Sequence, residues 1–515
     1  MVDFSPSVQD IVSRQKAQRF LLFWIFVATC CVVFFVSGAV MHWTTLGGPM
    51  AALLALSAFI IFAIPVIIWN WPIAGLYILI AGAAIIDNAV PTQPPIITGW
   101  IPLYLNIANA IGFFAHTHPI GGIKATPAEL IMGWTFLCWL VRSIVHRDLK
   151  FEPGMFYIWI IFWILNVFRA FLYGLVTGGQ FLTALWEIRA ECYFVAAYFM
   201  ASNLITDRRQ LKVLLWISVL GIGLMGILGT AKYIRYGPSV SHQGIMSHED
   251  SLFFNIIFLV VLVLGLAKTE PWILFAALAL MPTALIADLE NHRRAGIAAF
   301  AVAVIPVLMM LAVSLKKRRR SVITFIIGFA VFSIFYLVAF WNAPGALAMP
   351  ARAFRSKYGS PSSRDVMSDN YRLAENANLN FTRNLNLWWG YGYGKPYATP
   401  NPMPYIPDPL QLIIPHNGIL WMWMRLGTVG FYCFWMMIAL ALVRGASTIR
   451  DMDDPLVQSF GIICIAMILM LIIYGQYDTQ FAVYRSMYYS GALLGVLAVL
   501  GKLKKPQEPE VESAG

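Results

Sequence analysis

The chain has 515 residues, of which 59% are hydrophobic and only 12% are charged, and its mean hydropathy is +0.71. A soluble domain needs far more surface charge, so this composition excludes a soluble globular protein and indicates a polytopic membrane protein. The formal net charge of +11 does not indicate nucleic-acid binding, because surplus Lys and Arg in a membrane protein mark its cytoplasmic loops.

Apolar runs of about 17–25 residues predict the membrane-spanning helices. We expect about 12–14 of them, the first being an uncleaved helix rather than a signal peptide. The runs lie near residues 19–41, 50–69, 72–90, 127–145, 154–174, 190–206, 212–231, 251–267, 271–288, 295–315, 321–341, 417–443, 456–475 and 484–501.

Basic residues occur in alternate connections, such as Arg208–Arg209, residues 316–320 and Arg444–Arg450. The positive-inside rule therefore predicts that these connections and both termini are cytoplasmic, in an inner membrane. The six cysteines all fall within apolar runs and lack metal-ligand spacing, so neither a disulfide framework nor a metal site is expected.

The same alternation places residues 342–415 outside the cytoplasm as one large loop domain. Its basic residues, including Arg355, favour an anionic ligand. Residues 363–386 lack Pro and Gly and predict a helix on which Arg364, Arg372 and Arg383 share one face. Arg364 and Arg372 would lie about 12 Å apart, within reach of one diphosphate-sugar.

After this helix, three alternating glycines in residues 388–394 predict a tight turn or a close approach of two backbones. Trp388 and Trp389 precede the first of these glycines and could stack on sugar rings. The Pro-rich residues 396–415 predict extended chain that leads to His416 and Asn417.

Polar side chains at the predicted outer ends of helices are the candidates for chemistry. Arg293 and Arg294 open the 295–315 run, where arginine suits diphosphate oxygens but could also simply extend to the interface. The two lie about 100° apart on a helix, so at most one faces a given site. His416 could accept a proton from a sugar hydroxyl, although a lone histidine at a helix start is more often a cap or a packing partner.

Weaker candidates have simpler explanations. Glu187 and Glu191 are expected to form internal ion pairs, and Arg169 to face a partner inside the bundle. His242 and His248 could bind a metal, but their spacing is unspecific, so we assign no metal site and no cofactor.

Four segments together resemble the O-antigen ligase/polymerase superfamily of bacterial membrane glycosyltransferases, which includes Wzy-type polymerases. PHNGILWMWMRLGTVGFYCFWMM resembles its His-Asn…Leu…Gly…Gly signature, LNLWWGYGYG its Gly-x-Gly-x-Gly segment, SSRDVM its Ser-Gly-Arg, and HRRAG its Ser-Arg-Gly/Ala. The chain departs from the family at Arg425, where Glu is frequent, and at His292 or Arg293, which replace the usual Ser.

The resemblance implies a GT-C-like all-α polytopic fold with three parts. These are an N-terminal transmembrane body (1–240), a ligase-like catalytic region (241–445) and C-terminal helices with a cytoplasmic tail (446–515). It also implies a metal-independent, inverting glycosyltransferase that takes an oligosaccharide from undecaprenyl diphosphate, with an acceptor glycan or lipid A core as partner.

In that reading Arg294 (or Arg293) and Arg364 hold the diphosphate, and His416 activates the acceptor hydroxyl on the extracytoplasmic side. Arg355, Arg372, Trp389 and Asn417 are then expected to bind substrate. Two alternatives stay open: a polysaccharide polymerase of the same superfamily, and a transporter or flippase for lipid-linked glycans. A transporter usually shows internal repeats and charges near the bilayer midplane, and the sequence displays neither clearly.

Overall fold

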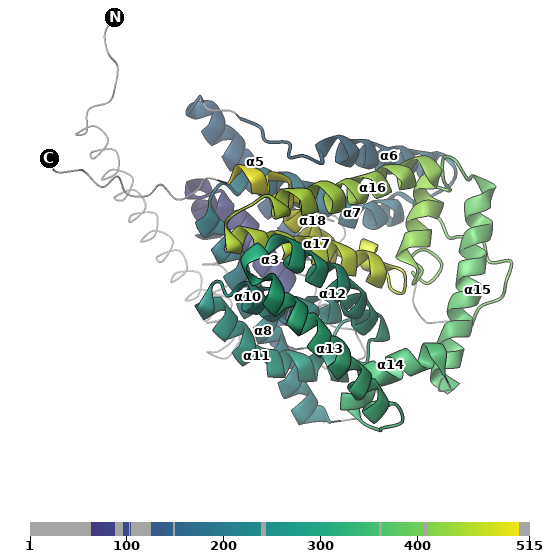
Figure 1. Ribbon diagram of the computed structural model, residues 1–515. Coiled ribbons are helices and arrows are strands. Elements are labelled where there is room, and N and C mark those ends of the chain that lie inside the picture. The colour runs from purple at the N-terminus through teal and green to yellow at the C-terminus, as the bar shows by residue number, and fades with distance from the viewer. Residues whose placement is uncertain are drawn as a thin grey trace, which may run out of the picture. The chain divides into compact units, whose positions relative to one another are not determined.

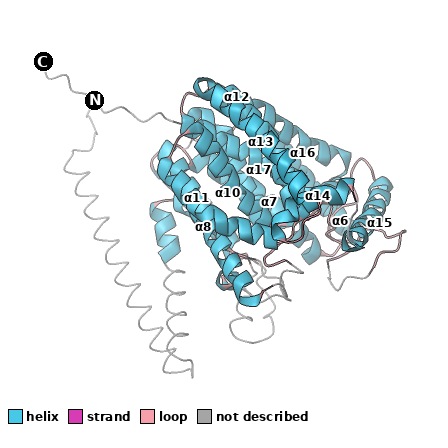
Figure 2. Cartoon of the chain, turned by 60° about the horizontal axis from the view of Figure 1, so that its bottom comes forward, coloured by secondary structure: helices cyan, strands magenta, loops and turns pink. Residues whose placement is uncertain are grey.

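The computed structural model describes residues 63–87, 96–101, 103–104, 125–147, 150–237, 244–359, 363–404 and 410–503. Within these ranges every regular element is a helix, and no strand occurs (Figures 1 and 2). The predicted all-α, polytopic membrane architecture is confirmed. The expected span at 19–41, most of that at 50–69, His242 and both termini lie outside the described residues.

Twelve of the predicted spans correspond to helices, most of them with ends shifted by a few residues. Their bounds are α3 Ile73–Ile85, α5 Pro127–Val145, α6 Tyr157–Val176, α7 Phe181–Leu204, α8 Arg208–Tyr236, α10 Asp250–Ala267, α11 Pro271–Glu290, α12 Arg294–Ser314, α13 Arg319–Phe340, α16 Gly418–Arg450, α17 Pro455–Gly475 and α18 Tyr484–Val499. Among the described helices, nine are long and apolar enough to cross a membrane.

The chain divides into two compact units. Unit 1 comprises residues 1–75 and 129–149, and unit 2 comprises residues 76–128 and 150–515. In unit 1, Trp134 of α5 donates a hydrogen bond from its indole N–H to the carbonyl oxygen of Pro65 at 2.9 Å. All of the candidate residues belong to unit 2.

Helix α7 begins earlier than the sequence predicts. The apolar run starts near residue 190, but the helix starts at Phe181. The prediction was too short because the helix contains Glu187, Arg189 and Glu191. These three charged residues interrupt the hydropathy signal, yet they are buried in the packed bundle. Here tertiary packing overrides local hydropathy.

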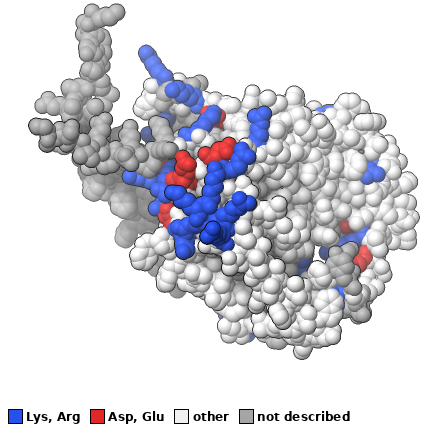
Figure 3. Space-filling view, viewed as in Figure 1, with Lys and Arg blue, Asp and Glu red and all other residues white. Residues whose placement is uncertain are grey.

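Several basic connections meet at one end of unit 2. Arg208 at the start of α8 forms ion pairs with Glu270, at 3.6 Å, and with Asp454, at 2.8 Å. These acidic residues immediately precede α11 and α17, so the three helices start at the same end, which we call the basic end. Figure 3 shows Lys and Arg gathered on part of one face, while much of the remaining visible surface carries no charge.

The predicted loop domain contains two α-helices among its described residues. These are α14 (Met349–Tyr358) and α15 (Ser363–Leu385), and α15 agrees closely with the helix predicted at 363–386. Figure 1 shows α15 beside the ends of other helices of unit 2 and connected through α14 to α13. Helix α13 itself packs weakly, since Val322 is the only buried residue in it.

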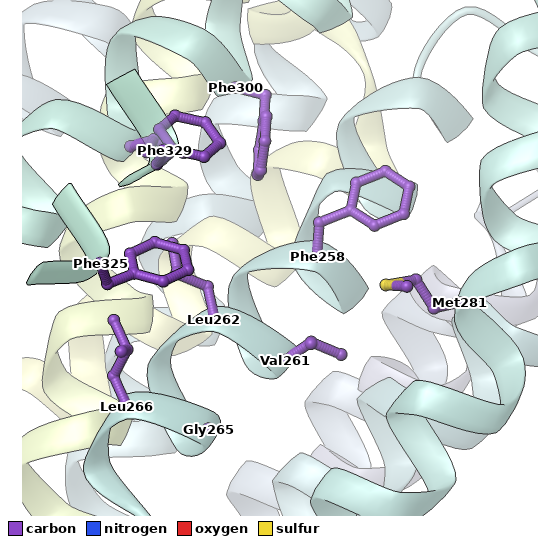
Figure 4. Close-up of a pocket in the computed structure, with 10 residues that line it drawn as sticks. Phe258, Val261, Leu262, Gly265, Leu266, Met281, Phe300, Phe325 and Phe329 are labelled. Atoms are coloured by element: carbon purple, nitrogen blue, oxygen red, sulfur yellow. The ribbon is translucent and has the colours of Figure 1, made fainter. Parts of the chain in front are cut away.

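An apolar cavity of about 310 Å³ lies between α10, α11, α12 and α13 (Figure 4). Aromatic side chains line much of it: Phe258, Phe300, Phe325 and Phe329. None of the polar candidates lines this cavity. Its apolar lining offers no group that could activate a hydroxyl, whereas the polar candidates lie at the ends of helices.

Candidate active site

His416 is fixed by a buried carboxylate that the sequence did not single out. Glu375 of α15 accepts two hydrogen bonds from it, from the main-chain N–H at 3.0 Å and from ring atom Nδ1 at 3.2 Å. The Glu375 side chain is 1% exposed, whereas that of His416 is 35% exposed. A carboxylate can only accept, so Nδ1 carries a proton and Nε2 is the ring nitrogen that remains for a substrate.

The pKa of His416 is the outcome of opposing effects. Burial alone lowers it, but the hydrogen bond and the negative charge of Glu375, helped by Asp478, raise the pKa above its ordinary value. The nearby positive charge of Arg372 opposes this rise. The arrangement makes His416 a stronger base than a histidine that is merely buried.

Asn417 has a structural role next to His416. Its Oδ1 accepts a hydrogen bond from the main-chain N–H of Leu420 at 3.0 Å, which caps α16. Its Nδ2 donates to Oδ1 of Asn376 at 3.1 Å. Asn417 and Glu375 thus join α15 to the start of α16, and this junction holds His416 in place.

Arg293 and Arg294 are oriented in different directions. Arg294 is the first residue of α12, whereas Arg293 precedes the helix with an extended backbone, so the expected helical spacing of about 100° does not apply to this pair. Arg294 donates to Oγ of Ser356 at 3.0 Å and approaches Oδ1 of Asp369 at 3.4 Å, so it reaches α14 and α15. Arg293 lies against the turn before α10, where a Cβ added to Gly244 would be 3.1 Å from its Nη2.

The remaining predicted arginines are dispersed. Arg372 is close enough to His416 to affect its pKa, as described above. Arg355 donates to the main-chain oxygen of Trp341 at 2.8 Å and to Oδ1 of Asn342 at 3.0 Å, at the end of α13. Arg364 lies in the first turn of α15, and its side chain lies outside the described residues.

Trp389 is placed against α6. Its carbonyl oxygen accepts a hydrogen bond from Arg169 at 2.7 Å, and the Arg169 guanidinium lies 5.3 Å from the Trp389 ring centre. This confirms that Arg169 has a partner, as the sequence suggested. The Trp389 ring is about half exposed, but no described contact connects it with His416.

The alternating glycines make the close backbone approaches that were predicted. Gly390, Gly392 and Gly394 all have φ between 80° and 85°, which favours glycine. A Cβ on Gly390 would lie 2.3 Å from the carbonyl oxygen of Arg425, and one on Gly392 would lie 2.7 Å from Cα of Gly174 in α6. The segment is therefore pressed between two helices.

A buried ion pair locks this segment in place. Arg425, fully buried in α16, pairs with Glu187 at 2.7 Å and donates to the carbonyl oxygens of Gly392, at 2.9 Å, and Ile413, at 3.0 Å. Glu187 also accepts from the main-chain N–H of Gly394 at 2.6 Å. The expected ion pairing is confirmed for Glu187, whereas Glu191 accepts hydrogen bonds from the Tyr393 hydroxyl, at 2.9 and 2.7 Å. Arg425 therefore has a structural role.

The sequence analysis did not single out two acidic residues of the site, Glu375 and Asp478. Glu375 is the sole glutamate of α15 and lies three positions after Arg372, which is a faint signal on the basic face. Asp478, between α17 and α18, binds Nδ1 of His248 through Oδ2 at 3.0 Å. It offers no local signal, because 230 residues separate these partners.

No group of three or more His, Cys, Asp or Glu side chains suited to a metal ion occurs within the described ranges. The weak metal candidate His248 is instead paired with Asp478. Its neighbours Glu249 and Asp250 both pair with the buried Arg485 of α18, at 3.5 and 2.8 Å.

Residues 276–435 match the profile of a protein family described as O-antigen ligase, Wzy_C. The match supports the resemblance of this region to the O-antigen ligase/polymerase superfamily. The ligase-family region runs from within α11 into α16 and includes Arg293, Arg294, Glu375 and His416. The match supports a membrane enzyme of the ligase/polymerase type, similar to glycosyltransferases. No curated protein matches the chain.

Proposed function

We propose that this enzyme transfers a glycan from undecaprenyl diphosphate to an acceptor hydroxyl, as an O-antigen ligase-like enzyme. The observation that carries the proposal is the His416–Glu375 pair inside the ligase-family region. A buried carboxylate on Nδ1 with a partly exposed ring is the arrangement that a general base for a sugar hydroxyl requires.

The proposed reaction is a single displacement. The acceptor oxygen forms a bond to the anomeric carbon, and the bond from that carbon to the diphosphate oxygen breaks with its electron pair, which inverts the configuration. The acceptor proton passes to Nε2 of His416, and Glu375 stabilises the resulting imidazolium. Since the groups named are a histidine, a carboxylate and arginines, the proposed chemistry needs no metal.

Arginines would neutralise the charge that develops on the leaving diphosphate, a contribution that is usually the largest in such reactions. Arg294 is the best placed of the described side chains on the loop side, since it reaches both α14 and α15. Arg364 is proposed from the resemblance, and Arg372 from its effect on the pKa of His416.

We further propose that this site lies on the extracytoplasmic face of the bacterial inner membrane. The basic end of unit 2 unites the starts of α8, α11 and α17, and positive connections favour the cytoplasm. Each of these helices must cross the membrane before it reaches the opposite end, where the α17–α18 connection contains Asp478.

The test is a reconstituted assay with purified protein in detergent. Undecaprenyl diphosphate-linked oligosaccharide is supplied with and without lipid A core, and wild type is compared with His416→Gln. We expect His416→Gln to keep donor binding and to lower the transfer rate roughly 10²–10⁴-fold, the usual contribution of a general base. Full activity of His416→Gln would contradict the proposal.

The same assay separates the alternatives. A single addition that requires the core indicates a ligase, whereas a ladder of products without core indicates a polymerase. Donor binding without any product in either condition would instead favour a transporter of lipid-linked glycans.

A further inference from the structure

A second histidine–carboxylate pair occurs near the first. Nδ1 of His248 and Oδ2 of Asp478 are 3.0 Å apart, and the side chains are 40% and 10% exposed respectively. Asp478 also accepts a hydrogen bond from the main-chain N–H of Thr479 at 2.7 Å, through Oδ1. As with His416, the carboxylate occupies Nδ1 and leaves Nε2 for a ligand.

The turn that carries His248 is rigidly held. Asn291, between α11 and α12, accepts from the main-chain N–H of Met246 at 3.2 Å and donates to the carbonyl oxygen of Ser247 at 3.0 Å. The Tyr474 hydroxyl of α17 donates to the carbonyl oxygen of His248 at 2.6 Å. These hydrogen bonds fix the main chain of the turn, and Asp478 fixes the imidazole, so His248 can hold a ligand in a defined position.

The pair lies between Arg293 and His416. Arg293 is packed against the same turn at Gly244. Burial raises the pKa of Asp478, but His248 and the positive charge of Arg293 together lower it below its ordinary value. On the other side, a Cβ on Gly418, two residues after His416, would be 3.4 Å from the main-chain oxygen of Asp478. The carboxylate of Asp478 also raises the pKa of His416.

We propose that His248, oriented by Asp478, and Arg293 form a second phosphoryl-binding pair that holds the leaving diphosphate opposite Arg294. This assignment rests on the proposed function. Arg294 approaches the site from the side of α14 and α15, whereas Arg293 and His248 approach from the turn before α10. A histidine that carries both protons donates from Nε2 to a phosphoryl oxygen, while Nδ1 remains bonded to Asp478. His248 transfers no proton; it donates a hydrogen bond to the oxygen that receives the electron pair.

The test measures binding of inorganic pyrophosphate to the purified full-length protein by titration calorimetry, so it does not depend on activity. We expect His248→Gln and Asp478→Asn each to weaken pyrophosphate binding about tenfold or more, because a hydrogen bond between charged groups is lost. The matched control is His292→Gln, since His292 is a nearby histidine that faces Glu290 at 3.8 Å. It should bind pyrophosphate like wild type.

Thermal unfolding is measured for His248→Gln and Asp478→Asn, so that a loss of pyrophosphate binding is not mistaken for a folding defect. Wild-type pyrophosphate affinity in folded His248→Gln and Asp478→Asn would overturn the inference, and so would the absence of pyrophosphate binding to wild type. His416→Gln separates this inference from the proposed function. If it retains transfer activity while pyrophosphate binding still depends on His248, the assigned base is wrong but the phosphoryl-binding pair stands.

Discussion

Glu375 determines at the residue scale how basic His416 can be. Burial disfavours the imidazolium, and the adjacent carboxylate more than compensates. Because the pKa of His416 is raised in the folded protein, the pair stabilises the fold fully below about pH 6.5, the ordinary value. That contribution is lost as the pH rises through the raised pKa.

Glu375→Gln should therefore shift the pH dependence of transfer. A base must be unprotonated, so the wild-type rate rises as the pH passes the raised pKa of His416; in the variant this rise moves to lower pH. We also expect the maximal rate to fall roughly 10–100-fold, a share of what a general base contributes. Rates measured from pH 5 to 9 check this. Glu152→Gln, which removes a carboxylate that pairs with Lys502 at 2.8 Å, is the control and should keep the wild-type profile.

The stability of the fold depends on the buried ion pair between Arg425 and Glu187. Arg425→Met leaves the carboxylate of Glu187 buried without its cation, which typically costs about 3–5 kcal/mol. We expect a large fall in the thermal unfolding temperature in detergent, and partial recovery in the double variant Arg425→Met/Glu187→Gln. Arg450→Gln breaks the solvent-exposed pair with Asp451 and should leave the unfolding temperature unchanged. Equal stability of Arg425→Met and wild type would show that the ion pair does not hold the segment.

At the scale of elements, the glycine-rich segment and α16 fit together only because both lack side chains at their crossing. Gly427 interrupts α16 with φ 70° and ψ 179°, a conformation that essentially only glycine adopts. A Cβ there would lie 2.3 Å from the main-chain nitrogen of Gly390 and 2.4 Å from the carbonyl oxygen of Trp388.

Gly427→Ala should consequently destabilise the protein by more than the roughly 1–3 kcal/mol of backbone strain alone, since backbone atoms must also separate. Transfer activity should fall as well, because the segment and the start of α16 share the Arg425 contacts. Gly328→Ala in α13 is the matched control: nothing lies within 4 Å of its Cβ, and alanine favours a helix. The unfolding temperatures of both variants are measured. If Gly427→Ala is as stable as wild type, the close backbone contact between Gly427 and the glycine-rich segment does not require glycine.

The whole molecule must place α15 and the basic end on opposite sides of the membrane if the proposal is correct. In a background with the six native cysteines replaced by alanine, Leu373→Cys on α15 and Ser447→Cys near the end of α16 provide exposed thiols. An impermeant maleimide added to spheroplasts should label Leu373→Cys alone. Lysed cells, as the control, should show labelling of both, and the reverse pattern in spheroplasts would invert the orientation.

Much of the architecture followed from local sequence. Hydropathy predicted the positions of twelve described helices, and the absence of Pro and Gly predicted α15 almost to the residue. The alternating glycines predicted a close backbone approach, and the signature around His416 agrees with the family match over residues 276–435. These features depend on near neighbours in the chain, which is why composition and spacing suffice to find them.

Only the tertiary structure decided which groups meet. Glu375 is 41 residues from His416, Asp478 is 230 from His248, and Glu187 is more than 230 from Arg425. Helical hydropathy specifies that a segment crosses the membrane but not its rotation or its neighbours, since lipid accepts any apolar face. The pairing of buried charges depends on that rotation, and so do the different directions of Arg293 and Arg294.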